Sequence, residues 1–167
     1  MTYQYHATPY DISASGFYFT NLEEYRAQAA SHRNAFGDPV EEYEIQFIDG
    51  DHPELFRVLG INQATLHLWF EHFEDLDAQD AVKAIYLADY VGTPIEDIPA
   101  ALDDVMLFEG TAQDYAESYI EDTGLLNEIP ENLRYYFDIK TFARDMVLGG
   151  GIAVIEIDGT PYVVEGG

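Results

Sequence analysis

Acidic residues outnumber basic ones more than fourfold in this chain, and their placement constrains what it can fold into. The 167 residues include 32 Asp and Glu against 7 Lys and Arg, a formal net charge of −25. No acidic run exceeds two residues, and pairs such as Glu41-Glu42, Asp103-Asp104 and Glu121-Asp122 are separated by apolar and aromatic residues. A disordered acidic tail would show blocks of like charge without hydrophobic periodicity. The sequence therefore predicts a folded scaffold with its charge on the surface.

The composition supplies the core that such a scaffold needs. The chain is 47% hydrophobic and contains 13 Tyr, 10 Phe and one Trp, whereas disordered acidic chains are poor in aromatic residues. It has no cysteine, which excludes disulfides, thiol nucleophiles and Cys-ligated metals. The amino-terminal residues lack a signal-peptide pattern, and no stretch approaches the ~20 apolar residues of a membrane span. We expect a cytoplasmic protein that does not contact membranes.

The charge is concentrated in the middle of the chain. Residues 34–133 hold 24 of the 32 acids, opposed only by Arg57 and Lys83, a net of −22. Nucleic acids and anionic membranes are attracted by Lys and Arg, so this chain would repel them. A partner selected by electrostatics is therefore basic.

The first 59 residues predict a small mixed α/β unit. Residues 16–20 are strand-like, and residues 22–33 predict a helix capped by Asn21, with Glu24 as the reciprocal carboxylate. Residues 42–48 alternate polar and apolar side chains, as in a half-buried strand.

From about residue 60 to 105 the pattern predicts short acidic helices. Apolar residues recur at helical spacing between Leu66 and Phe73, and Glu71, Glu74 and Asp75 are expected to project away from that stripe. Asp77 predicts the start of a helix that runs to Gly92. Thr93 to Glu96 predict a further start with Pro94 at the first helical position, and Pro99 is expected to interrupt that helix.

Residues 106–167 predict an α+β unit. Val105 to Phe108 indicate a short strand, Thr111 caps a helix that stops at Gly124, and further helical pieces start at Pro130 and Asp138. Residues 152–164 predict a hairpin with Asp158-Gly159 as its turn. The expected fold class is thus α+β, with three small domains in series: 1–59, 60–105 and 106–167.

No motif predicts catalysis or a bound metal. The turn Asp49-Gly50-Asp51 lacks the later bidentate Glu of a calcium loop. His67 and His72 would lie about 140° apart on a regular helix, too far apart to share one ion. Two carboxylates in a cleft could form a hydrolase, but with 32 acids such a pair has almost no specificity. We expect no cofactor and no enzyme activity.

The charge density suggests imitation of DNA. Duplex DNA carries one negative charge per ~1.7 Å of its axis, so 25 charges correspond to about 42 Å of duplex, or roughly 12 base pairs. The alternatives are an acidic, salt-adapted protein with another basic partner and, with less support, a carboxylate-based hydrolase. Salt adaptation should make a surface acidic throughout, which the charge distribution disfavours.

One segment resembles a known family. Residues 125–138, LLNEIPENLRYYFD, are similar to the antirestriction motif of the ArdA antirestriction proteins, and the flanking residues 119–124 and 142–145 also match. The resemblance covers essentially the whole chain. It implies an elongated, curved homodimer of three small domains per chain that mimics bent B-form DNA. Such a protein blocks the DNA-binding groove of type I restriction-modification enzymes and so protects incoming mobile DNA, without catalysis or a cofactor.

The residues expected to contact the enzyme fall into two sets. The candidate phosphate mimics are Glu41, Glu42, Glu44, Glu71, Glu74, Asp75, Asp77, Asp80, Glu96, Asp97, Asp103, Asp104, Glu109, Asp114, Glu117, Glu121 and Asp122. The candidate motif residues are Leu125, Leu126, Glu128, Pro130, Glu131, Leu133, Tyr136, Phe137 and Asp138. The near-helical spacing of the apolar motif residues fits packing inside the third domain, and a subunit interface or direct enzyme contact is the alternative. We also expect the homodimer to form through the carboxyl-terminal unit, whose hairpin has undefended edges.

Overall fold

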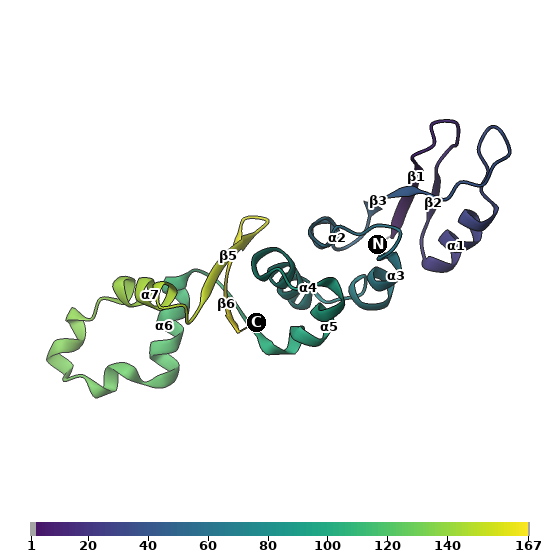
Figure 1. Ribbon diagram of the computed structural model, residues 1–167. Coiled ribbons are helices and arrows are strands. Elements are labelled where there is room, and N and C mark those ends of the chain that lie inside the picture. Colours follow the sequence, from purple (N-terminus) through teal and green to yellow (C-terminus); the bar gives the residue numbers. More distant parts are fainter. Residues whose placement is uncertain (1–2, 167) are drawn as a thin grey trace. The chain divides into compact units, whose positions relative to one another are not determined.

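The computed structural model describes residues 3–166 and has an α+β fold with two small antiparallel sheets (Figure 1). The chain divides into two compact units, residues 1–99 and 100–167, and each contains one three-stranded sheet. The predicted α+β class is confirmed. The elongated three-domain arrangement, with borders after residues 59 and 105, stays a prediction.

The first unit contains one sheet and a series of short helices. Its strands are β1 (Gln4–Pro9), β2 (Phe17–Phe19) and β3 (Tyr43–Asp49). Its α-helices are α1 (Leu22–Ser31), α2 (Pro53–Leu59), α3 (Leu66–Leu68) and α4 (Ala78–Ile85). Trp69–Phe73 and Tyr86–Val91 are π-helical continuations of α3 and α4, and Ile95–Asp97 is a 3₁₀ turn.

The second unit combines one sheet with two longer α-helices and several short helical turns. After α5 (Ile98–Ala101), which spans the border, come a 3₁₀ turn (Leu102–Asp104), β4 (Val105–Glu109), α6 (Ala112–Thr123), two 3₁₀ segments (Leu125–Glu128 and Glu131–Tyr136), α7 (Ile139–Leu148), β5 (Ala153–Ile157) and β6 (Thr160–Gly166).

Strand β1 is the centre of the first sheet, in the order β2-β1-β3. Tyr5 lies between Phe19 on β2 and Phe47 on β3, and its side chain is fully buried. The sequence interpretation assigned no element to this segment. The only signal in the sequence was the alternation of Tyr5 and Ala7 with His6 and Thr8, which spans just four residues. In the structure Tyr5 and Ala7 are buried, and His6 and Thr8 are half-buried.

Aromatic side chains join this sheet to the helices that follow it. Trp69 is 1% exposed, and its ring meets Phe56 of α2 edge-on at a centroid distance of 5.1 Å. Phe47 of β3 contacts both of these rings. Edge-to-face pairs of this kind stabilise a core beyond the area they bury. Helix α2 was also missing from the sequence interpretation, although Pro53 in its first turn and Gly60 at its end, with φ of 62°, are typical helix boundaries.

Several predicted helix boundaries are confirmed, and two predictions that involve prolines are wrong. The Asn21 side chain accepts from the Glu24 N–H, while the Glu24 carboxylate accepts from the Thr20 N–H and hydroxyl. Pro99 does not interrupt a helix as predicted, because it lies in the first turn of α5. A backbone N–H has no helical partner there, so proline costs nothing at that position. Pro94 immediately precedes the 3₁₀ turn instead of being its first residue.

The second sheet has the order β4-β6-β5, with β6 in the middle. The predicted strand near Val105 and the hairpin are confirmed. The hairpin turn places Asp158 and Gly159 at φ of 50° and 78°, as a two-residue turn of the primed type requires. The predicted start of α6 is confirmed as a full capping box between Thr111 and Asp114, and its predicted stop is Gly124 in the left-handed conformation.

Candidate acidic interface

The predicted phosphate mimics are surface residues. Among residues 3–166 no charged side chain is buried. All the candidate carboxylates are exposed except Glu74 and Asp80, which are half-buried. In the first unit they lie just before and within β3, between Trp69 and the first turn of α4, and in the 3₁₀ turn Ile95–Asp97. In the second unit they lie around β4 and along α6.

Few of these carboxylates are neutralised within the chain. Across the described residues the ion pairs with Lys or Arg involve Glu54 with Arg57, Asp80 with Lys83 at 3.7 Å and Asp145 with Arg144 at 3.6 Å. Glu71 lies 3.7 Å from His72, which is a cation only when protonated. The remaining candidates have no cationic partner in that part of the chain. Each unit therefore presents a strongly negative surface of its own.

Helix α6 orders three of the acids in one row. Asp114, Glu117 and Glu121 are spaced by three and four residues, so they follow one face, about one turn apart. Asp114 also has a structural role, since it accepts from the Thr111 N–H at 3.0 Å. Hydrogen bonds to the backbone and side chain of Thr111 hold the pKa of Asp114 below its usual range. The regular spacing of this row comes directly from helix geometry.

Glu74 does not project away from the core as predicted. The helix from Leu66 widens into a π-helix at Trp69, and the Glu74 N–H bonds to the Trp69 carbonyl, five residues back, at 2.9 Å. The wider turn shifts the face that later residues occupy. The Glu74 carboxylate accepts from the Tyr5 hydroxyl at 2.6 Å, and burial raises its pKa. Its role as a phosphate mimic stays a prediction, as do those of the other candidates.

Tyr5, which is buried beneath the acidic segment, is the residue that the sequence interpretation missed here. Its hydroxyl also accepts from Trp69 Nε1 at 2.8 Å, and burial raises its own pKa. The three side chains form a hydrogen-bonded chain from the central strand to the acidic helical segment. Only the alternation at residues 5 and 7 could have indicated that Tyr5 is buried.

The metal candidates gain no additional ligands from the fold. Within the described range no three His, Asp or Glu side chains are grouped as a metal site would require. In the turn at residues 49–51, Asp49 accepts from the Gly50 N–H at 3.0 Å and Asp51 accepts from the Tyr3 hydroxyl. The latter bond raises the pKa of Tyr3 to about 12. Between residues 3 and 166, no helix combines the length and apolar character needed to cross a membrane.

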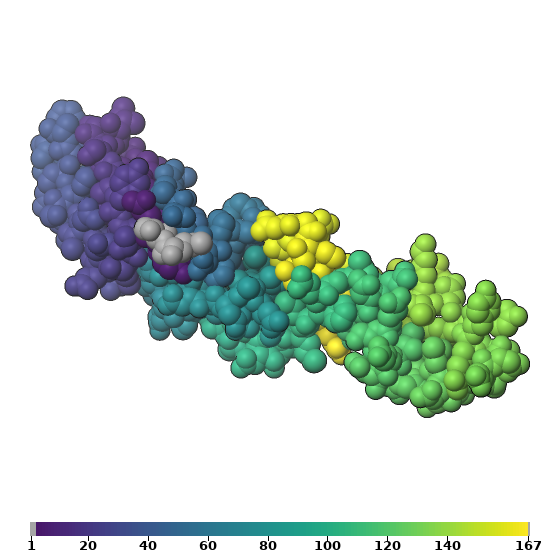
Figure 2. Space-filling view, turned by 180° about the vertical axis from the view of Figure 1, so that it is seen from behind, coloured from purple at the N-terminus to yellow at the C-terminus, as the bar shows by residue number. Residues whose placement is uncertain are grey.

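The segment 125–138 lies at the surface of the second unit (Figure 2, light green). It consists mainly of two 3₁₀ segments, and none of its residues is buried. Tyr135 and Tyr136 are 90% and 77% exposed, and Leu133 is 49% exposed. Phe137 contacts Phe142 of α7 at 5.5 Å, which attaches the end of the segment to the unit. Leu125, Leu126 and Phe137 are half-buried, so packing within the unit and contact with a partner both stay open for the apolar residues of this segment.

Comparison with protein families gives one result that spans these features. The model of the antirestriction protein family ArdA matches residues 5–159. The chain belongs to the ArdA antirestriction family. The match covers most of both units and the whole of segment 125–138, and it confirms the resemblance seen in the sequence. Antirestriction is the function this family membership implies. Comparison with curated proteins finds no significant match.

Proposed function

We propose that this ArdA-family chain is a DNA mimic that occupies the DNA-binding groove of type I restriction-modification enzymes in the cytoplasm. One observation carries the proposal: the acids are exposed in both units, and within the described residues only a few have a cationic partner. A basic groove that normally binds phosphates would bind these carboxylates favourably, because its cations would neutralise their charge. The protein acts by binding alone and needs no cofactor.

The periodic spacing of the acids supports this mechanism within each unit. Carboxylates one turn apart on α6 repeat at about 5.4 Å along the helix axis, so the helix presents negative charge at regular intervals, as a phosphate backbone does. Acids held by helix caps, such as Asp77 and Asp114, keep fixed positions because their oxygens accept backbone N–H groups. A preorganised row of charge loses less entropy on binding than flexible side chains do.

We further propose that the active form is a homodimer joined through the second unit. That unit exposes Tyr135, Tyr136 and Leu133 in segment 125–138, together with Val154 on the edge strand β5. Pairing through the acids of the first unit would instead place like charges together. A homodimer would also double the roughly 12 base-pair charge equivalent of one chain.

Competition against DNA tests the mimic. A type I methyltransferase is loaded with a labelled duplex and titrated with the protein. We expect the protein to release the duplex, and to do so less effectively as salt rises, because opposite charges are screened over about 8 to 10 Å. Retention of the label at saturating protein would contradict the mechanism. A salt-adapted protein with another partner would leave the duplex bound, and a hydrolase would require turnover of a substrate.

A further inference from the structure

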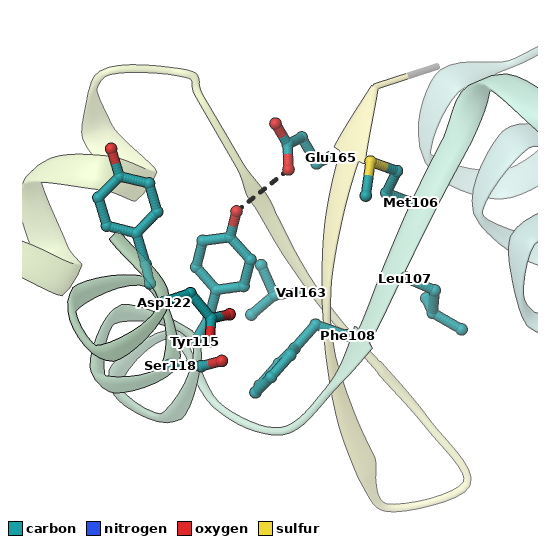
Figure 3. Close-up of a pocket in the computed structure, with 9 residues that line it drawn as sticks. Met106, Leu107, Phe108, Tyr115, Ser118, Asp122, Val163 and Glu165 are labelled. Carbon is teal, nitrogen blue, oxygen red and sulfur yellow. Dashed lines mark hydrogen bonds between the residues drawn. The ribbon is translucent and has the colours of Figure 1, made fainter. Parts of the chain in front are cut away.

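A small pocket lies in the second unit between helix α6 and the strands β4 and β6 (Figure 3). Its volume is about 260 Å³. Pockets for drug-sized ligands measure about 300–1,000 Å³, so this one suits a single side chain. It belongs to neither the acidic row of α6 nor segment 125–138.

Aromatic rings form much of the pocket wall. Phe108 of β4 meets Tyr115 of α6 edge-on at a centroid distance of 5.5 Å. Tyr119, one turn further along α6, and Met106, which is 66% exposed, extend the apolar lining. Aromatic faces carry negative electrostatic potential and attract a cation that lies over the ring.

Two carboxylates, Asp122 and Glu165, also line the pocket. Glu165 Oε2 accepts from the Tyr115 hydroxyl at 3.1 Å, the dashed line in Figure 3, which fixes the carboxylate beside the ring. Throughout residues 3–166 no Lys or Arg forms an ion pair with either carboxylate. The pocket thus has negative charge on an apolar, aromatic lining and no cation of its own.

We propose that this pocket binds one arginine side chain of the basic partner protein. A guanidinium group stacks on aromatic rings and bonds to carboxylates through planar donors, which an ammonium group does less well. The methylene stem of the arginine would lie along Met106 and Phe108 while the charge reaches Asp122 or Glu165. The inference rests on the proposed function, and it adds a discrete anchor to an otherwise distributed contact.

Binding of a small arginine probe tests the pocket without any enzyme. The full chain has three methionines, of which Met106 lines the pocket, whereas Met146 lines a neighbouring hollow that shares Tyr115, Tyr119 and Glu165 with it. The chain is labelled with ¹³C at its methionine methyl groups and titrated with N-acetyl-arginine methylamide at low salt. Met106→Leu assigns the Met106 signal. The neutral isostere, N-acetyl-citrulline methylamide, is the matched ligand control.

We expect the arginine probe to move the Met106 signal saturably and further than the Met146 signal, because only Met106 lines the pocket itself. Citrulline should move neither signal. Asp122→Asn with Glu165→Gln should weaken the probe about tenfold, because an apolar wall strengthens the charge pair. Glu117→Gln with Glu121→Gln removes the same charge from α6 outside the pocket, and it should weaken the probe no more than about twofold. Equal effects of the two probes, or of the two double variants, would overturn the proposal.

The same two variants are then compared in duplex displacement. We expect the pocket variant to lose about tenfold more potency than the α6 control, with circular dichroism confirming that both are folded. A chain that binds the probe but never displaces DNA would refute the proposed function and leave the pocket intact. Displacement by a chain that does not bind the probe would refute the pocket alone. If the pocket variant instead sediments as a monomer while the parent is a dimer, a second copy occupies the pocket and the inference is wrong.

Discussion

The Tyr5 hydroxyl donates a hydrogen bond to Glu74 Oε2 at 2.6 Å, across 69 residues of sequence. Tyr5 lies in the central strand of the first sheet, and Glu74 follows the π-helix that begins at Trp69. The bond therefore attaches the acidic helical segment to the sheet. Neighbouring Glu71 and Asp75 are exposed, so the attachment of Glu74 sets where their charges are displayed.

Tyr5→Phe should destabilise the first unit. It removes the donor to the half-buried Glu74 and the acceptor for Trp69 Nε1, which is then left without a partner in the core. We expect a loss of about 1–3 kcal/mol in the free energy of unfolding, measured by urea titration. Tyr18→Phe is the matched control, because its ring is 57% exposed on the neighbouring strand. Equal stability of the two variants would show that the buried bond contributes nothing.

Glu74→Gln should change the pH dependence of stability. Burial raises the pKa of Glu74 above its ordinary value of 4.5, so the folded chain holds this proton to higher pH than the unfolded chain does. The contribution of the carboxyl to stability is then greatest below pH 4.5 and falls as pH rises through the folded pKa.

Glutamine removes this titration while keeping an acceptor for Tyr5. Relative to the parent, the variant should gain stability between pH 4 and pH 7, as measured by urea unfolding at each pH. The exposed Glu71→Gln removes the same charge and should show a smaller gain. Parallel pH profiles for the parent and Glu74→Gln would contradict the burial of this carboxyl.

Much of the fold follows from local signals that short segments carry by themselves. Asn21, Asp77, Thr111 and Asp138 were identified as caps because a side-chain oxygen three residues before a free N–H is a local arrangement. The turn at Asp158 is local in the same way. Strand β1 was missed because its pairing with both β2 and β3 depends on residues far along the chain.

The sequence predicted that acidic side chains would be exposed, but it did not predict the position of each one correctly. The prediction grouped Glu74 with Glu71 and Asp75, whereas Glu74 bonds to Tyr5 at the point where the helix has widened into a π-helix from Trp69. Nothing in the local sequence marks that widening. The pocket beside α6 was not predictable either, because Phe108, Tyr115 and Glu165 come from three separate elements.

Neutral substitution of the acids should reveal a distributed contact. We expect any one of Glu71→Gln, Asp75→Asn, Asp103→Asn or Asp104→Asn to weaken duplex displacement by no more than about fivefold, since each exposed carboxylate contributes about 1 kcal/mol or less. Combining all four should cause a much larger loss. Glu74→Gln should weaken displacement less than Glu71→Gln, because the Glu74 carboxylate is already engaged by Tyr5. A folded single variant without activity would point to a localised site.

Charges placed in segment 125–138 should dissociate the proposed homodimer. Tyr135 and Tyr136 are among the most exposed aromatic residues of the described chain, and burying them between two copies would remove apolar surface from water. Tyr135→Glu with Tyr136→Glu would force like charges together, so we expect a species near 18.9 kDa by sedimentation at micromolar concentration where the parent sediments as a dimer. Tyr90→Glu, at a 53% exposed tyrosine of the first unit, adds one charge elsewhere and should leave the dimer intact. A dimer that survives the Tyr135 and Tyr136 changes but is lost with Val154→Glu would move the interface to the edge strand β5. A parent chain that sediments only as a monomer would rule out the dimer itself.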